Sequence, residues 1–169
     1  MKNSFSTPLL SERKTMRRTE KEIRNRAEID SVIRRSKVCR LGLSDQGTPY
    51  IVPLCFGYDG QSLYFHCARQ GRKLDILRQN DKVCFEFDIV EGIVEADRGC
   101  DWGICYQSVI GSGRACLVED PIEKEQALSL IMAQYSKRTF SFPPEMVART
   151  AVVKITIDGL TGKQSKRLT

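Results

Sequence analysis

The stretch "CRLGLSDQGTPYIVPLCFGYDGQSLYFHCA", residues 39–68, decides the fold. It contains three segments rich in apolar, β-branched and aromatic residues, separated by the turn sequences DQGT and DGQ. Apolar alternation with this punctuation predicts a three-stranded antiparallel meander. Pro53 lies inside the second segment and cannot donate to a strand ladder, so it predicts a bulge or an unpaired edge there.

The rest of the chain adds strands and short helices. We predict strands in KVCFEFDIV (82–90), YQSVIGSGRACLVE (106–119) and AVVKITIDGL (151–160). Helices are predicted over about 26–36, over GRKLDILRQN (71–80) and over DPIEKEQALSLIMAQYSK (120–137). The first and third have capping-box spacing, at Asn25–Glu28 and Asp120–Glu123, and the third has the apolar stripe Leu128, Ile131 and Tyr135. The second has Leu74 and Leu77 on one side and Asn80 as a stop. Six antiparallel strands with short helices indicate a mainly β protein, a small barrel decorated by helices.

Composition predicts one soluble domain. The chain has 169 residues, of which 41% are hydrophobic and 28% charged, which suits a single domain over residues 19–169 behind a basic arm at 1–18. No apolar run approaches the roughly 20 residues of a membrane span. The N-terminal sequence lacks the apolar stretch of a secretory signal, so a cytoplasmic location is expected.

The charge is uneven along the chain. Residues 1–40 carry 12 basic and 5 acidic side chains, residues 41–119 carry 7 and 11, and residues 120–169 carry 8 and 5. A nucleic-acid binder usually has a basic face on its folded body, whereas the middle of this chain is acidic. We therefore expect no nucleic-acid partner, and interpret the arm as solvated or packed on a partner.

The seven cysteines do not predict a metal site. No pair has C-x-x-C spacing and the chain has one histidine, so zinc or iron–sulfur binding is not expected. Most of the cysteines lie in apolar runs, where a thiol behaves as a small hydrophobe. We expect most of them to be buried free thiols.

A strand passes into a helix at "YFHCARQGRK", residues 64–73. A helix N-terminus offers unpaired N–H groups and a partial positive charge, which suit an anion. Gly71 lets the backbone approach a ligand, and Arg72 and Lys73 add cationic donors. Two interpretations stay open from these residues alone, a phosphate site and a solvated basic first turn.

His66 allows two interpretations as well. A lone histidine in an apolar strand is often a core residue, but this one lies near the strand end, where it could donate to a phosphate or line a pocket. No carboxylate is obviously placed to orient it as a general base, and no nucleophile motif is present. Covalent hydrolytic chemistry is therefore not expected.

Residues 39–88 resemble the FMN-binding split-barrel proteins, in particular the pyridoxamine 5′-phosphate oxidase-related branch that includes the nitroimidazole-resistance (Nim-type) flavoproteins. CDWGICYQSVIGSGRA (100–115) and VVKITIDGLTGKQS (152–165) resemble the same group. The resemblance covers about residues 16–166. It implies a six-stranded antiparallel split barrel that forms a homodimer, with FMN at the subunit interface.

The resemblance also implies a set of site residues. Val52, Pro53 and Leu54 would line the flavin ring and ribityl chain, largely through the backbone. Phe65 and His66 would approach the ribityl–phosphate part, and Arg72 and Lys73 would bind the phosphate. Ser108 matches a polar flavin-contacting position that is glutamine in the oxidase. Tyr106 and Trp102 would close the pocket, or else pack in the barrel or interface.

The resemblance implies an FMN-dependent oxidoreductase that reduces a small acceptor such as a 5-nitroimidazole or another nitro-aromatic compound. His66, the candidate catalytic residue, would hold the cofactor or contact the acceptor. Oxidation of pyridoxamine phosphate is not expected, because the C-terminal substrate-binding block of the oxidase is absent. Two alternatives remain: a non-catalytic flavin-binding or redox-sensing protein, and a heme or deazaflavin binder on the same barrel.

Overall fold

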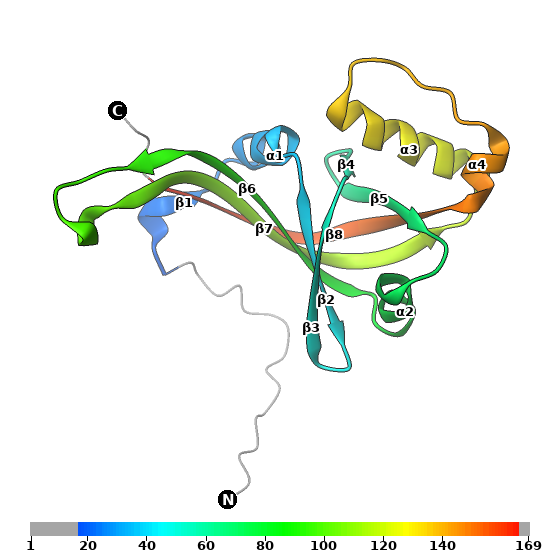
Figure 1. The fold of residues 1–169 in the computed structure, drawn as a ribbon, viewed down its shortest axis with the longest axis horizontal. Coiled ribbons are helices and arrows are strands. Elements are labelled where there is room, and N and C mark those ends of the chain that lie inside the picture. Colours follow the sequence, from blue (N-terminus) through cyan, green and yellow to red (C-terminus); the bar gives the residue numbers. More distant parts are fainter. Residues whose placement is uncertain (1–16, 166–169) are drawn as a thin grey trace, which may run out of the picture.

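The computed structural model describes residues 17–165, which form one antiparallel sheet with helices against it (Figure 1). Across the sheet the strands lie in the order β3-β2-β6-β7-β8-β5-β4, and β1 pairs with β8. The strands are β1 (Glu22–Ile23), β2 (Cys39–Asp45), β3 (Thr48–Leu54), β4 (Gly57–Tyr58), β5 (Ser62–Ala68), β6 (Lys82–Val94), β7 (Gly103–Val118) and β8 (Thr150–Gln164). The helices are α1 (Arg26–Arg35), α2 (Arg72–Gln79), α3 (Pro121–Tyr135) and α4 (Pro144–Arg149), with 3-10 turns η1 (Thr19–Lys21) and η2 (Gly99–Asp101).

The predicted mainly β fold is confirmed. The six predicted strands are present as β2, β3, β5, β6, β7 and β8, but the predicted second strand, residues 49–58, is interrupted at residues 55–56 and continues as the two-residue strand β4. The two-residue strand β1 was not predicted. Every pair of neighbouring strands is antiparallel. β3 lies at the end of the strand order, so Pro53 lies on an edge strand, as its missing N–H requires.

Strands β6 and β7 extend together beyond the rest of the sheet (Figure 1). Their pairing runs from Lys82 opposite Arg114 to Val94 opposite Gly103, with an irregularity between Val90 and Gly92. The sequence prediction ended β6 at residue 90 and began β7 at residue 106, so it missed the outer part of this hairpin. Glycine and acidic residues weaken the strand pattern there.

Aromatic residues fill the centre of the barrel. Phe56, Phe65, Phe85 and Phe87 are each no more than 2% exposed. The rings of Phe56 and Phe87 lie 4.8 Å apart, and those of Phe85 and Phe87 lie 5.9 Å apart. Tilted ring pairs at these distances are favourable beyond their buried area, so these rings fix how the sheet closes around the core.

Helix α3 covers the other side of β5 and forms a second cluster. Its buried residues Ala127, Leu128 and Ile131 pack with Tyr64 and Val152. In Figure 1, α3 lies beside β4 and β5. The predicted apolar stripe is confirmed for Leu128 and Ile131, whereas Tyr135 at its end is 37% exposed.

The Tyr135 hydroxyl still joins α3 to the barrel. It accepts a hydrogen bond from the Phe56 backbone N–H and donates to the Lys37 carbonyl, both at 3.0 Å. Burial raises the pKa of Tyr135 to about 12, so the hydroxyl keeps the proton that it donates. This one group satisfies backbone atoms of two segments outside the regular strands.

The predicted helix starts are confirmed. The Asn25 side chain accepts from the Ala27 N–H at 2.9 Å, and the Asp120 side chain accepts from the Glu123 N–H at 2.8 Å. The Glu123 carboxylate accepts from the Lys154 ammonium at 3.2 Å. The side chain predicted to complete the capping box therefore pairs with β8.

The prediction that most cysteines are buried is wrong. Cys39 and Cys105 are buried and Cys67 is intermediate, but four are exposed: Cys55, Cys84, Cys100 and Cys116. Cys84 and Cys116 lie on strands, where successive side chains point to opposite faces. An apolar run was therefore a poor guide to the burial of any one of its members.

Most of the predicted basic arm, residues 1–18, lies outside the described residues, and its boundary with the domain stays a prediction. In the described part of the chain, no helix is long and apolar enough to cross a membrane.

Gly57 tests the contact between α3 and the barrel. A Cβ at this position would lie 2.7 Å from the Ile131 backbone nitrogen and 2.7 Å from the Leu130 carbonyl carbon. Because backbone cannot rotate away, Gly57→Ala should lower the free energy of unfolding by about 1–3 kcal/mol, as overpacking does. Urea denaturation followed by circular dichroism measures the change.

Gly99→Ala is the matched control, since a Cβ there would meet nothing within 4 Å. Its effect should stay within about 1 kcal/mol. Equal destabilisation by the two variants would contradict the proposed close packing of α3 against β4.

Candidate functional site

The junction of β5 and α2 carries the residues that the sequence singled out. Gly71 occupies the N-cap of α2 with φ 135°, and no side chain among residues 17–165 caps this end of the helix. A Cβ on Gly71 would meet nothing within 4 Å, so space remains open beside the first turn. The positive φ is a conformation that glycine adopts without strain. The helix therefore presents uncapped N–H groups toward open space.

Arg72 and Lys73 differ in how the protein holds them. The Arg72 guanidinium pairs with the Asp45 carboxylate at 3.2 Å and lies 4.6 Å from the centroid of the Tyr50 ring. The Lys73 ammonium lies 5.2 Å from the Phe65 ring centroid. Within residues 17–165, no carboxylate forms an ion pair with Lys73. Lys73 is thus a cation still available to an anionic ligand.

Phe65 and His66 lie on opposite faces of β5, because side chains alternate along a strand. Phe65 is 2% exposed and belongs to the main core cluster. His66 is exposed, and its side chain makes no hydrogen bond to another described residue. Next along the strand, burial raises the pKa of the Cys67 thiol, and the nearby Lys73 partly offsets this effect. Lys73 therefore lies close to the Phe65–Cys67 face of β5.

The three predicted residues of β3 divide in the same way. Val52 and Leu54 are partly buried and pack against the core, whereas Pro53 is exposed. The side chains of Val52 and Leu54 therefore point to the inner face of β3, and the Pro53 side chain points to the outer face. A ligand along the outer face would meet Pro53 and the exposed Ile51, and could meet Val52 and Leu54 through the backbone.

Strand pairing brings distant residues onto this outer face. One row crosses four strands, from Pro53 through Arg40 and Glu86 to Ile110. Residues paired side by side share a face, so the predicted site residues Pro53, Ser108 and Tyr106 lie on one surface. Ser108 is opposite Asp88 and Tyr106 is opposite Val90. We call the face that carries these rows the outer sheet face.

The outer sheet face is unusually apolar for exposed surface. The exposed fractions are 67% for Ile51, 58% for Val90, 62% for Ile93, 53% for Ile104 and 51% for Ile110. Exposed apolar side chains that lie together mark interaction surfaces. Trp102, at 51% exposed, lies at the tip of the β6–β7 hairpin, where its indole N–H donates to the Ala96 carbonyl at 2.6 Å.

A small polar group interrupts the apolar surface. The Arg40 guanidinium pairs with Glu86 at 3.1 Å and also with Asp88. Burial raises the pKa of Glu86, the neighbouring Asp88 raises it further, and Arg40 lowers it. Two carboxylates with one cation therefore leave the outer sheet face slightly acidic between β2 and β6.

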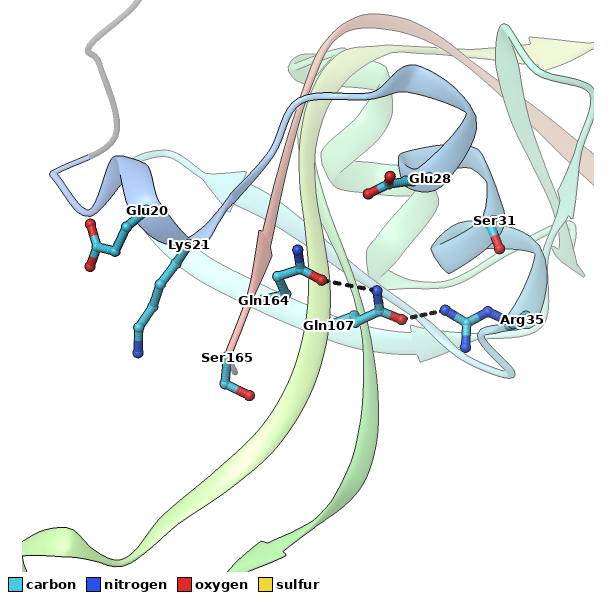
Figure 2. Close-up of a pocket in the computed structure, with 8 residues that line it drawn as sticks. All are labelled: Glu20, Lys21, Glu28, Ser31, Arg35, Gln107, Gln164 and Ser165. Carbon is cyan, nitrogen blue, oxygen red and sulfur yellow. Dashed lines mark hydrogen bonds between the residues drawn. The ribbon is translucent and has the colours of Figure 1, made fainter. Parts of the chain in front are cut away.

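Sequence reasoning missed a polar cavity of about 600 Å³ between α1, η1, β7 and β8. Figure 2 shows Gln107 in its wall, with the Arg35 guanidinium donating to the Gln107 carbonyl and the Gln107 amide donating to Gln164 at 3.4 Å. Gln107 is 7% exposed. The signal was present in the sequence, because Gln107 takes an inward position between Cys105 and Val109.

Within the described residues, no three His, Cys, Asp or Glu side chains are placed to hold a metal ion.

The structure brings together Arg72, Lys73 and Phe65 at the β5–α2 junction, and separately Pro53, Tyr106 and Ser108 on the outer sheet face. The cations at the junction suit the anionic end of a ligand.

Comparisons with known proteins point to one family. The model of the family described as pyridoxamine 5′-phosphate oxidase matches residues 25–164. No curated protein sequence matches the chain.

Solved structures agree with this fold. A candidate 5-nitroimidazole antibiotic resistance protein from Bacteroides thetaiotaomicron is 34% identical, with 84% of this chain and 85% of that chain covered and a TM-score of 0.76. A flavocytochrome from Azotobacter vinelandii is 20% identical, with 90% and 72% covered and a TM-score of 0.79. An FAD- and heme-binding protein from Mycobacterium smegmatis is 19% identical, with 87% and 74% covered and a TM-score of 0.76. The last two similarities concern the fold alone.

Glu86→Gln tests the electrostatics of the outer sheet face. The pKa of Glu86 is raised from 4.5, so the native protein gains stability as the pH falls and this carboxylate takes up a proton. The neutral variant should therefore be more stable at pH 7, by under about 1 kcal/mol. Its advantage should vanish as the pH falls below the ordinary carboxylate range.

Urea denaturation at pH 7 and pH 4 measures this difference, with the exposed Glu125→Gln as control. A variant that is less stable than the native chain at pH 7 would show that the Arg40–Glu86 ion pair outweighs the cost of burying the charge.

Proposed function

This chain belongs to the pyridoxamine 5′-phosphate oxidase family, and on that premise we propose that it binds FMN and uses it to reduce a small acceptor. The observation that carries the proposal is the uncapped N-terminus of α2, where Gly71 leaves open space beside the cations Arg72 and Lys73. When bound, a flavin supplies hydride and electron transfer. The residues of the chain supply binding, orientation and electrostatics.

The phosphate would bind at the first turn of α2. Its oxygens would accept from the uncapped backbone N–H groups and from Lys73, which has no carboxylate partner among the described residues. Arg72 already pairs with Asp45, so its guanidinium is oriented before the ligand arrives. Charge-assisted hydrogen bonds of this kind are among the strongest that proteins make.

The flavin ring would lie along the edge of β3. The strand offers backbone atoms at Val52, Pro53 and Leu54, because the side chains of Val52 and Leu54 point into the core. Pro53 has no N–H to donate, so the neighbouring residues would make the hydrogen bonds to the edge of the flavin ring. His66 would contact the cofactor or the acceptor. We do not assign it as a general base, because none of the described carboxylates hydrogen-bonds to it.

The second wall of the site would come from a second copy of the chain. The outer sheet face exposes Ile51, Val90, Ile93, Ile104 and Ile110, and burying these residues in a homodimer would remove them from water. Tyr106 and Ser108 lie on the same face. The dimer would then bring the partner's Tyr106 and Ser108 toward the flavin held at β3.

The acceptor class follows from the relative described as a candidate 5-nitroimidazole antibiotic resistance protein. We assign a small nitro-aromatic compound, which needs a flat apolar surface beside the flavin. Relatives described as a flavocytochrome and as an FAD- and heme-binding protein keep heme as a second candidate, and the visible absorption spectrum of the purified protein distinguishes the two cofactors.

Turnover distinguishes an enzyme from a non-catalytic flavin protein. Purified protein with FMN is mixed with reduced nicotinamide cofactor and a 5-nitroimidazole, and loss of the nitro absorbance is followed. Flavin that is reduced but not reoxidised by the nitro compound would favour a storage or redox-sensing role.

The phosphate site predicts the behaviour of the double variant Arg72→Ala/Lys73→Ala. Loss of two charge-assisted contacts should cost about 3 kcal/mol, which weakens FMN binding about 100-fold. The variant should be purified colourless and should unfold at nearly the native temperature, because both side chains are exposed or half-buried. Equilibrium dialysis with FMN measures the affinity.

Lys137→Ala/Arg138→Ala is the matched control, since it removes an adjacent exposed Lys–Arg pair after α3. It should bind FMN as the native chain does. Native FMN affinity in the Arg72→Ala/Lys73→Ala variant would show that the phosphate does not bind at α2.

The dimer predicts that Ile110→Glu dissociates the protein. The new carboxylate would be buried at the centre of the outer sheet face, directly opposite Glu86, at a cost of roughly 2 kcal/mol or more, about 30-fold in the dissociation constant. Sedimentation velocity measures the association state, and FMN should be lost together with the dimer.

Ile122→Glu is the control, because Ile122 is 69% exposed on α3 and lies away from this face. It should leave the dimer intact. A native chain that is monomeric with FMN bound would refute the shared site.

A further inference from the structure

Three charged side chains lie together on the outer sheet face, and we call them the Arg40 group. Arg40 on β2 forms ion pairs with both Glu86 and Asp88 on β6. No other cation among residues 17–165 forms an ion pair with either carboxylate. The Arg40 group therefore holds two carboxylates and one guanidinium, and one negative charge is left without a counter-charge inside it.

The Arg40 group lies within the apolar part of this face. Glu86 is directly opposite Ile110 on β7, and in the other direction its row passes Arg40 and reaches Pro53 on β3. The Glu86 side chain is 31% exposed and the Asp88 side chain 32% exposed. Most of each carboxylate side chain is thus already covered in a single copy, and the part still in water faces outward beside Ile110.

Dimerisation through the outer sheet face would remove that last part from water. A carboxylate that loses its water without gaining a counter-charge is costly to bury, and it lowers this cost by taking up a proton. Glu86 already shows this tendency, because burial raises its pKa, the neighbouring Asp88 raises it further and Arg40 lowers it. A second copy over the face would add to the burial that dominates this balance.

The nearest other cations on the outer sheet face lie too far away to neutralise the extra charge. Lys163 on β8 is opposite Ser108, which is opposite Asp88, so Lys163 lies two strands or about 10 Å from Asp88. Lys82 is on the same strand as Glu86 but four residues earlier, about 13 Å away. Charges at such separations are largely screened at physiological ionic strength.

The remaining ionisable groups around β6 are neutral or paired. Burial raises the pKa of the Cys84 thiol on the same face, and it raises that of Cys39, on the inner face of β2, to about 12. Arg114 on β7 pairs with Asp81 at 3.2 Å. His66 is on β5, three strands from β6. Glu86 is therefore the group through which pH can act on this face.

We propose that a proton taken up by Glu86 controls dimerisation, so that two copies associate more tightly at acidic than at neutral pH. The inference rests on the proposed homodimer and adds its regulation. A protonated Glu86 leaves Arg40 and Asp88 as a balanced pair in the interface. The favourable contribution is present below the carboxylate pKa of a single copy and is lost as the pH rises through the higher pKa of the dimer. Because the partner copy completes the flavin site, flavin retention falls with the dimer.

The test is analytical ultracentrifugation of the full chain with excess FMN at pH 5, 6, 7 and 8 and constant ionic strength. The dissociation constant should rise about tenfold or more from pH 5 to pH 8, because dissociation releases the bound protons. A dissociation constant that stays level would overturn the proposal. One that falls would also overturn it, and would show that cations of the partner copy pair with these carboxylates.

Variants assign the effect, because the phosphate of FMN and His66 also titrate in this range. Glu86→Gln should make the dissociation constant nearly independent of pH and close to the native value at pH 5. Glu125→Gln, on an exposed position of α3, should keep the native profile. Arg40→Gln leaves two carboxylates without a cation, so it should weaken the dimer more at pH 8 than at pH 5. Circular dichroism verifies the fold of each variant.

The outcomes separate this inference from the dimer on which it rests. A native chain that is monomeric from pH 5 to pH 8 would refute the homodimer and its regulation together. A native dimer with the full pH profile retained in Glu86→Gln, or with the same loss at both pH values in Arg40→Gln, would refute control by Glu86 and leave the homodimer standing.

Discussion

The register of β7 between β6 and β8 determines where every candidate residue lies. β7 pairs with β6 from Gly103 to Arg114 and with β8 from Gln107 to Val118. Because side chains alternate along a strand, this register sends Val109 into the core and Ile110 to the outer sheet face. A shift by one residue would exchange the two sets. The fully buried Val109 opposes such a shift, since its side chain would have to move into water.

The sequence was sufficient for the architecture because its signals are local. Turn residues, the Asp120 cap and the alternation in residues 39–68 each depend on a few neighbours, and all agree with the structure. The outer β6–β7 hairpin could not be predicted, because Glu91, Gly92 and Gly103 weaken the strand pattern there. The two strands are extended in this part because they pair with each other. The burial of cysteines failed for a related reason: an apolar run does not say which face each residue takes.

The sequence predicted the positive charge of the candidate site but not the contacts that its side chains make. Gly71, Arg72 and Lys73 stand together in the sequence, and α2 does begin there. The sequence could not show that Arg72 is paired with Asp45 from β2 while Lys73 has no such partner. Long-range placement decides which cations remain available to ligands.

The position of β3 at the end of the sheet has a consequence for solubility. An edge strand with free N–H groups is a template on which strands of other molecules can add, and this is one route to fibrils. β3 contains two prolines, Pro49 and Pro53, on either side of Ile51. Neither has an N–H to donate, so an incoming strand would find the ladder interrupted on both sides of the exposed isoleucine. The same prolines that shape this edge for a ligand would thus restrain it from seeding polymerisation.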